Sequence, residues 1–195
     1  MSNNILVKDN FFDKIDELRE LSYSLDHIHH EKMPVEPGWK GYRTWELSHY
    51  DSPIIQALYK QIIETVSDYF GLVGYDSEIY SHESYKEIEK EGNRIHIDPV
   101  PYAGVLYLTP DIPLECGTTI FLNDERVDIE NKYNRLILYR GTFKHGITNF
   151  FGDNKDNVRR TINFFIDIES HIQMQKNYME MFRLTFENNV IAQIQ

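Results

Sequence analysis

The sequence is poor in cysteine, with Cys116 as its single thiol among 195 residues. One cysteine excludes an intrachain disulfide and any zinc or iron–sulfur site built from several cysteines, and it fits a reducing compartment. The sequence also lacks an apolar stretch long enough to span a bilayer. The segment Met1 to Ile5 shows no basic region followed by an apolar run, as a secretory signal would. We therefore expect a cytoplasmic protein with no membrane segment.

Basic residues are scarce relative to acidic ones. Lysine and arginine number 20 against 31 Asp and Glu residues, which gives a formal net charge of -11 at pH 7. Binding to a nucleic-acid backbone needs clustered Lys and Arg that release counterions from the phosphates. We therefore expect no such binding, whereas protein, peptide and small-molecule partners stay open.

What the sequence does contain is enough apolar and aromatic material for a β-rich core. Hydrophobic residues make up 41% and aromatic residues 13%, and the length suits one domain spanning residues 1–195. Within residues 77–169, short runs of alternating apolar and polar residues between glycines and prolines predict strands. Seven or eight such strands are typical of a sandwich or jelly roll. With one further strand near the N-terminus, they are predicted at Ile5–Val7, Glu78–Tyr85, Arg94–Asp98, Gly104–Leu108, Thr118–Leu122, Leu136–Tyr139, His145–Thr148 and Arg160–Ile168.

Residues 1–76 are expected to be mostly helical cover, packed on one outer face of the β region. Apolar residues recur at helical spacing from Phe12 to Leu25 and from Ile54 to Phe70. Ser52-Pro53 is a start signal for the second helix, and Gly71 is a stop signal.

Two other segments allow less specific predictions. Residues 170–195 are predicted to add a C-terminal helix and a tail. The aromatic-rich extended segment Pro37–Trp45 fits either core packing or the rim of a pocket.

The residues with the clearest chemistry are His96 and Asp98, which stand two positions apart. In an extended strand they point to the same face, while Ile97 points to the other. His145, near the end of the β region, is the best further partner among the remaining histidines. Two imidazoles and one carboxylate on one face form the ligand set that non-haem Fe(II) prefers. Such a site keeps coordination positions free for a co-substrate and dioxygen.

A candidate carboxylate-binding group follows in the last predicted strand. Arg159, Thr161 and Asn163 share one polar face of that strand. A guanidinium binds a carboxylate with two parallel hydrogen bonds and stays charged at any relevant pH. Arg160 is the competing candidate, since a shift of one residue would exchange the two arginines. We favour Arg159 because Thr161 and Asn163 share its phase.

The order of these elements resembles the pattern of the Fe(II)/2-oxoglutarate-dependent dioxygenases: a His-x-Asp motif, a distal His and an Arg-x-Ser/Thr motif. Two further segments resemble strands of the prolyl-hydroxylase-like branch of that family. The first is Ala103–Pro110, which resembles the strand that follows the metal motif. The second is Gly117–Phe121, which resembles the next strand along the chain. The resemblance covers about Tyr85 to Ile166.

The resemblance implies a double-stranded β-helix, a cupin-like jelly roll, with Fe(II) held by His96, Asp98 and His145 at one open end. Arg159 and Thr161 would then bind the distal carboxylate of 2-oxoglutarate. Two tyrosines are further candidates for the co-substrate pocket, namely Tyr107, which also fits a plain core role, and Tyr85. Dioxygen would be the second co-substrate and ascorbate the reductant.

The function implied is hydroxylation coupled to the oxidative decarboxylation of 2-oxoglutarate. A prolyl or other amino-acid side chain, in a protein, a peptide or a small molecule, is the favoured target. The alternative is a jelly-roll module that binds a metal or ligand without oxygenase activity. Two acidic segments, Lys86–Gly92 and Asn123–Asn134, are candidate rims of the pocket, and their charge predicts a neutral or basic substrate.

Overall fold

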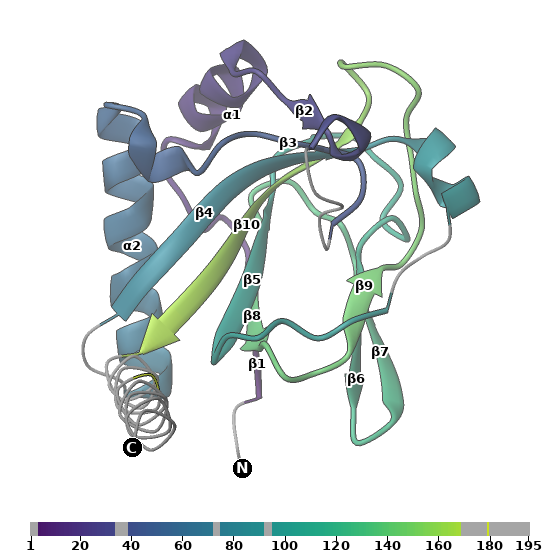
Figure 1. The fold of residues 1–195 in the computed structure, drawn as a ribbon. Coiled ribbons are helices and arrows are strands. Elements are labelled where there is room, and N and C mark those ends of the chain that lie inside the picture. Colours follow the sequence, from purple (N-terminus) through teal and green to yellow (C-terminus); the bar gives the residue numbers. More distant parts are fainter. Residues whose placement is uncertain (1–3, 34–38, 72–74, 92–94, 169–178, 180–195) are drawn as a thin grey trace, which may run out of the picture.

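The fold is built on two antiparallel β-sheets. This computed structural model describes residues 4–33, 39–71, 75–91, 95–168 and 179. The larger sheet has seven strands in the order β1-β8-β5-β10-β4-β3-β2, and the smaller has three in the order β7-β6-β9 (Figure 1). The strands are β1 Ile5–Lys8, β2 Ile28–His29, β3 Tyr42–Arg43, β4 Tyr75–Ser84, β5 Tyr102–Tyr107, β6 Thr118–Leu122, β7 Glu125–Ile129, β8 Leu136–Arg140, β9 His145–Ile147 and β10 Arg159–Ile168.

Two α-helices, α1 (Ile15–Ser24) and α2 (Pro53–Phe70), cover the outer face of the larger sheet (Figure 1). Helix α2 begins at its proline and ends at Gly71, whose φ of 67° is the left-handed conformation that glycine adopts without strain. Short 3-10 helices lie at His30–Lys32 (η1), Leu47–His49 (η2) and Lys86–Glu91 (η3).

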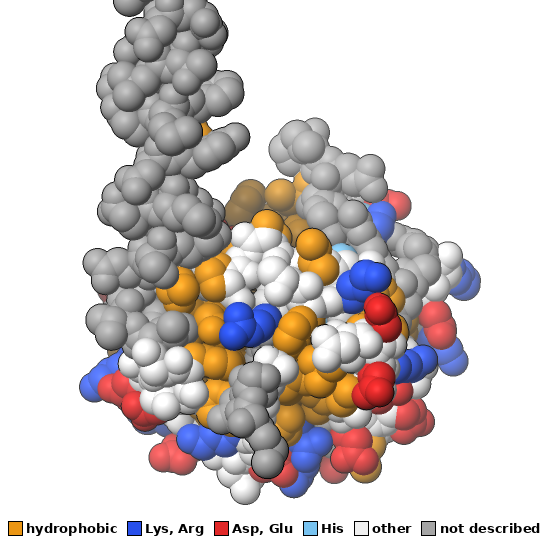
Figure 2. All heavy atoms as spheres, turned by 90° about the horizontal axis from the view of Figure 1, so that it is seen from below, with side chains coloured by type: hydrophobic (Ala, Val, Ile, Leu, Met, Phe, Trp, Pro, Cys, Tyr) orange, Lys and Arg blue, Asp and Glu red, His pale blue; other side chains and the backbone are white. Residues whose placement is uncertain are grey.

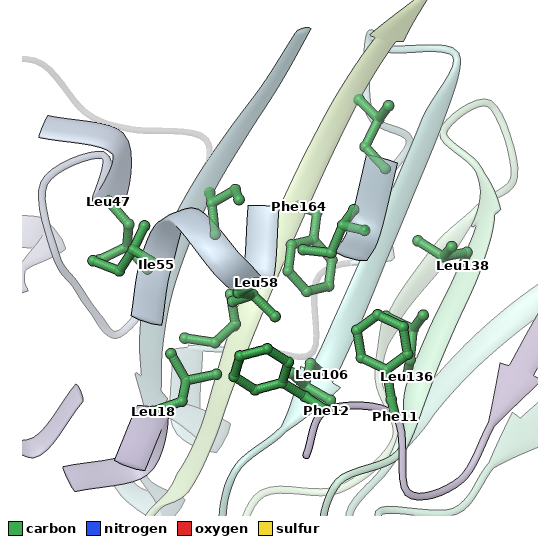
Figure 3. Packing of buried hydrophobic residues seen from close by; sticks show 14 of the residues in the cluster. Phe11, Phe12, Leu18, Leu47, Ile55, Leu58, Leu106, Leu136, Leu138 and Phe164 are labelled. Atoms are coloured by element: carbon green, nitrogen blue, oxygen red, sulfur yellow. The ribbon is translucent and has the colours of Figure 1, made fainter. Parts of the chain in front are cut away.

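The main hydrophobic core lies between these helices and the larger sheet. Figure 3 shows the helical side chain of Leu58 close to the sheet side chains of Leu106 and Phe164, while Ile55 lies beside Leu47 in the same cluster. Removing these side chains from water supplies the largest favourable contribution to holding the helices on the sheet.

A second, smaller core lies on the opposite face of the larger sheet, toward the smaller one. Side chains alternate between the two faces along each strand. On β5, Leu106 belongs to the helix-facing core, whereas Val105 and Tyr107 belong to the inner one. The same alternation on β10 puts Ile162 and Phe164 in the helix-facing core. Arg159, Thr161 and Asn163 therefore have the opposite phase and point toward the space between the sheets.

The predicted jelly roll and the two helices on its outer face are confirmed, and three details differ. The strand predicted at Arg94–Asp98 is wrong, because in its described part only His96 forms a β-bridge, to His145. The hairpin strand β7, which lies inside the segment predicted as an acidic rim, was not predicted. The short strands β2 and β3 were also missed. The predicted C-terminal helix lies outside the described residues except at Met179.

The face of the molecule that is seen from below in Figure 2 carries many hydrophobic side chains. Figure 2 shows that they gather over the central part of the face seen from below, with acidic side chains mostly toward its margin. None of the described helices has the length and apolar character needed to cross a membrane.

Candidate metal centre and the adjoining cavity

Three side chains meet at one end of the space between the sheets. His96, Asp98 and His145 each offer a ligand atom, and these atoms lie within 4.8 Å of one another. The Asp98 carboxylate lies between the rings, with Oδ1 3.6 Å from His96 Nε2 and Oδ2 3.1 Å from His145 Nε2. Asp98 and His145 are buried, whereas the His96 side chain is 38% exposed. The group is thus open to ligands on the His96 side.

Backbone hydrogen bonds hold this group together. His96 and His145 exchange two of them, from His96 N to His145 O at 3.0 Å and from His145 N to His96 O at 2.8 Å. Asp98 N donates to the carbonyl of Gly141, 2.8 Å away, at the end of β8. The segment 95–98 is therefore fixed against β8 and β9 without being a regular strand.

The donor set fits a divalent transition metal. His145 Nδ1 lies 2.8 Å from the carbonyl oxygen of Phe143, so that nitrogen carries the proton and Nε2 presents its lone pair to the centre. Two imidazole nitrogens and one carboxylate suit Fe(II), and a site with three protein ligands leaves positions for exogenous ligands. Such a metal would also compensate the negative charge of the buried Asp98 carboxylate.

A cavity of about 420 Å³ opens beside the three residues. This volume lies in the range of small-molecule sites, about 300 to 1,000 Å³. Both sheets contribute to its wall. The polar and aromatic residues in its lining include Trp39, Lys40, Arg43, His82, Ser84, His96, Asp98, Thr118, Tyr139, His145, Phe150, Arg159, Asn163 and Phe165.

Arg159 lies in the wall of this cavity with its guanidinium firmly anchored. Nε donates to the carbonyl of Cys116 at 3.0 Å, and Nη2 lies 3.3 Å from both the Gly117 carbonyl and Thr118 Oγ1. The Tyr107 hydroxyl is 2.7 Å from the same Thr118 oxygen. Burial lowers the pKa of Arg159 and raises the pKa of Tyr107. The result is a fixed cation with a hydroxyl-bearing neighbour, an arrangement suited to an anionic ligand.

Arg160 points the other way, into a buried network under α1. It forms an ion pair with Glu83, and its Nη1 donates to the carbonyl and hydroxyl oxygens of Ser22 at 3.0 and 3.1 Å. The structure therefore brings Arg159 to the cavity and gives Arg160 a structural position, as the phase of the strand predicted.

The other two predicted co-substrate residues are placed differently. Thr161 is fully buried on the cavity side of β10, where its hydroxyl donates to Asn163 Oδ1 at 2.8 Å. Tyr85 does not join the site. It lies with Glu83 in a separate hollow, and its hydroxyl donates to Glu83 Oε2 at 2.9 Å. Placing Tyr85 in the co-substrate pocket is wrong because β4 alternates: His82 and Ser84 line the cavity, and Glu83 and Tyr85 point away from it.

Several cavity residues were not predicted individually. Trp39 and Arg43 come from the aromatic-rich segment for which a pocket rim was one of two interpretations. His82 comes from β4, whose alternating pattern identified a strand but not its cavity-facing side. The two predicted acidic rims contribute no described residue to the lining.

No protein-family model and no curated protein matches this sequence. Solved structures do resemble the fold at low identity. A prolyl hydroxylase from Trichoplax adhaerens, in complex with a hypoxia inducible factor oxygen degradation domain peptide, superposes with a TM-score of 0.60 at 15% identity, covering 89% of this chain and 87% of that one. A Pseudomonas putida prolyl-4-hydroxylase gives 0.55 at 15% identity, with coverages of 85% and 93%.

A third similar structure is HygX from Streptomyces hygroscopicus with nickel, 2-oxoglutarate and hygromycin B bound. Its TM-score is 0.57 at 15% identity, and the match covers 85% of this chain and 83% of that one. The chain therefore has the jelly-roll fold of the 2-oxoglutarate and Fe(II) oxygenases. The two prolyl hydroxylases and HygX share this fold with the chain.

Proposed function

We propose that this protein is an Fe(II)/2-oxoglutarate-dependent oxygenase that hydroxylates an amino-acid side chain, prolyl or other. The observation that carries the proposal is that one cavity contains both the His96, Asp98 and His145 group and the buried Arg159 guanidinium. A metal site alone would suit many proteins. A metal site and a fixed carboxylate receptor in the same cavity suit a bidentate co-substrate with a distal carboxylate.

In this proposal His96, Asp98 and His145 hold the metal, and Arg159 binds the distal carboxylate of 2-oxoglutarate. The hydrogen bonds from Arg159 to Cys116 and Gly117 engage Nε and Nη2, and Nη1 is assigned to the carboxylate of the co-substrate. Tyr107 and Thr118 support the guanidinium through their shared hydrogen bond. Thr161 orients Asn163 at the cavity wall.

The bound Fe(II) and 2-oxoglutarate would supply the oxidising chemistry, in which dioxygen is consumed and 2-oxoglutarate is decarboxylated to succinate. The chain's own residues bind and position the reactants and exclude water from them. The buried ring of Tyr139 and the half-buried ring of Phe150 line the cavity, which lowers the local dielectric constant and strengthens the Arg159 interaction.

Ascorbate as reductant and a cytoplasmic location belong to the same proposal. The buried free thiol of Cys116, whose carbonyl anchors Arg159, suits a reducing compartment.

The test is to incubate the protein with Fe(II), ascorbate and 2-oxoglutarate under air, with a panel of amino acids and peptides, and to measure succinate. We expect substrate-stimulated succinate formation that Asp98→Ala abolishes. Failure of the protein to bind 2-oxoglutarate would overturn the proposal. Binding of both metal and 2-oxoglutarate without succinate from any candidate would favour the alternative, a ligand-binding module without oxygenase activity.

A further inference from the structure

A second cation faces the cavity from the short strand β3. The Arg43 guanidinium carbon lies 3.2 Å from the centre of the Tyr80 ring and 5.5 Å from the centres of the Trp39 and Phe165 rings. Three aromatic rings thus hold the guanidinium in place through cation–π contacts. Its Nε is buried and has no hydrogen-bond partner among the described residues.

Acidic residues also lie near Arg43, which lines a second, smaller hollow together with Glu78, Asp98 and Asp167. Glu78 and Asp98 interact with it electrostatically. The Glu78 carboxylate accepts a hydrogen bond from the Tyr80 hydroxyl at 2.7 Å, and Asp98 belongs to the candidate metal centre. Arg43 is therefore a fixed, partly buried cation in the wall of the cavity, held by aromatic rings.

His82 lies beside Arg43 on the neighbouring strand, where the two residues are partners in the β3–β4 register. Its side chain lines the cavity, is 7% exposed and stands 5.6 Å from the Trp39 ring. The buried Nε2 has no hydrogen-bond partner among the described residues. Buried polar atoms of this kind are normally satisfied, so a ligand in the cavity is the natural partner.

The charge of the cavity wall is opposite to that of the protein. Its described lining contains the cations Lys40, Arg43 and Arg159 but one carboxylate, Asp98, although the whole chain carries -11. In the proposed function, a divalent metal and Arg159 together with Asp98 carry a charge of about +2, which dianionic 2-oxoglutarate neutralises. The positive charge on the Arg43 side is left for the second ligand of the cavity.

We infer that the substrate of this oxygenase carries a carboxylate, which binds the Arg43 guanidinium and His82 Nε2 while the carbon to be hydroxylated lies toward His96 and Asp98. This inference rests on the proposed function and narrows its substrate class. A free amino acid, or the C-terminal residue of a peptide, offers such a carboxylate. A prolyl residue inside a peptide does not. The cavity thus selects for a carboxylate group, which a substrate that is neutral overall, such as a zwitterionic amino acid, also offers.

The experiment uses the full chain loaded with Zn(II) and 2-oxoglutarate, which does not turn over, and isothermal titration with 4-methylpentanoate and its neutral isostere 4-methylpentanamide. We expect the acid to bind at least about tenfold more tightly than the amide. In Arg43→Met this preference should disappear. It should persist in Arg126→Met, which removes an exposed arginine outside the cavity.

Equal affinity for acid and amide in the wild-type protein, or a preference that survives Arg43→Met, would overturn the inference. If Arg43→Met does not fold by circular dichroism, Arg43→Gln makes the same comparison with a shorter polar side chain. The experiment distinguishes failure of the carboxylate subsite from failure of the proposed function. Should 2-oxoglutarate not bind, the proposed function is lost, but an Arg43-dependent acid preference measured with Zn(II) alone still supports the carboxylate subsite.

Discussion

His96 and His145 are joined by two backbone hydrogen bonds, of 3.0 and 2.8 Å, and their rings stand 4.4 Å apart between centres. This antiparallel bridge is what makes one site from two distant parts of the sequence. Because the backbone sets the separation of the imidazoles, the site is preorganised, and metal binding need not reorder a loop. Asp98 follows on the same segment and faces both rings.

Removing Asp98 is expected to abolish tight metal binding. The Asp98→Ala variant loses the one carboxylate of the group, so we expect Co(II) affinity to fall at least about 100-fold, beyond what loss of an outer hydrogen-bond partner typically costs. Titration with Co(II), followed by visible absorption, measures this. Metal-induced thermal stabilisation, about 2.7 kcal/mol at 100 times the Kd, should vanish in parallel. Asp128→Ala, an exposed carboxylate on β7, is the control. A variant at Asp98 with unchanged Co(II) affinity would refute the site.

Much of this site was predictable because its signals are local. His96 and Asp98 share a face over three residues, and Arg159 shares one with Thr161 and Asn163, so alternation alone placed them. The side chains of His96 and Asp98 do lie close together, although the strand predicted around them did not form. An extended segment with one β-bridge directs side chains as a strand does.

What the sequence could not provide is the pairing of distant strands. Arg43 reaches the cavity because β3 pairs with β4 and puts Arg43 opposite His82. No local pattern encodes that pairing. The error at Tyr85 has the same origin. Alternation on β4 was evident, but which of its faces meets the cavity depends on its pairing with β10, where Ser84 is opposite Arg159.

Arg159 and Arg160 are adjacent, and their replacement should have different effects. Arg159→Met removes a charge-assisted contact worth about 1.5 to 3 kcal/mol, so 2-oxoglutarate affinity should fall about 10- to 100-fold. Arg160→Met should leave that affinity nearly unchanged but destabilise the fold by about 3 to 5 kcal/mol, because Glu83 then remains buried without its partner. Isothermal titration and urea unfolding separate the two effects. The reverse pattern would mean that Arg160 is the co-substrate residue.

A double variant tests the cause of the Arg160 effect. Glu83→Gln combined with Arg160→Met removes both charges, so part of the stability lost in Arg160→Met should return, at least about 1 kcal/mol. Urea unfolding of the two single variants and the double variant gives the coupling energy. Strict additivity would show that the ion pair under α1 is not the source of the loss.

Asp9 should make stability depend on pH in the acid range. It pairs with Arg135 and Lys132, both at 2.6 Å, and hydrogen bonding to these cations lowers its pKa from 3.8 to about 2. Since the unfolded chain binds the proton more tightly, this contribution is present above about pH 4 and is lost toward pH 2. Asp9 is 34% exposed, so solvent screening limits it to less than about 1 kcal/mol. Urea unfolding of Asp9→Asn and wild type should differ at pH 6, and the difference should shrink as the pH falls from 4 toward 2. A pH-independent difference would contradict this account.

Gly141 should control metal binding without touching the metal. A Cβ at this position would lie 2.2 Å from the Val100 carbonyl oxygen and 3.0 Å from that of Asp98, both backbone atoms that a side-chain rotation cannot move. In Gly141→Ala the segment around Asp98 must therefore shift. This shift lengthens the hydrogen bond that Asp98 N donates to the Gly141 carbonyl oxygen. We expect Co(II) affinity to fall about 10- to 100-fold, as when a supporting contact of a ligand is lost.

Gly71→Ala is the matched control for this effect, since Gly71 ends α2 with nothing within 4 Å of the added Cβ. Its positive φ makes alanine unfavourable there, so it should cost stability, about 1 kcal/mol, but not metal affinity. Comparing Co(II) affinity with urea stability in both variants distinguishes a displaced ligand from general destabilisation. If Gly141→Ala loses only stability, the position of Asp98 does not depend on the close approach of these two backbone segments.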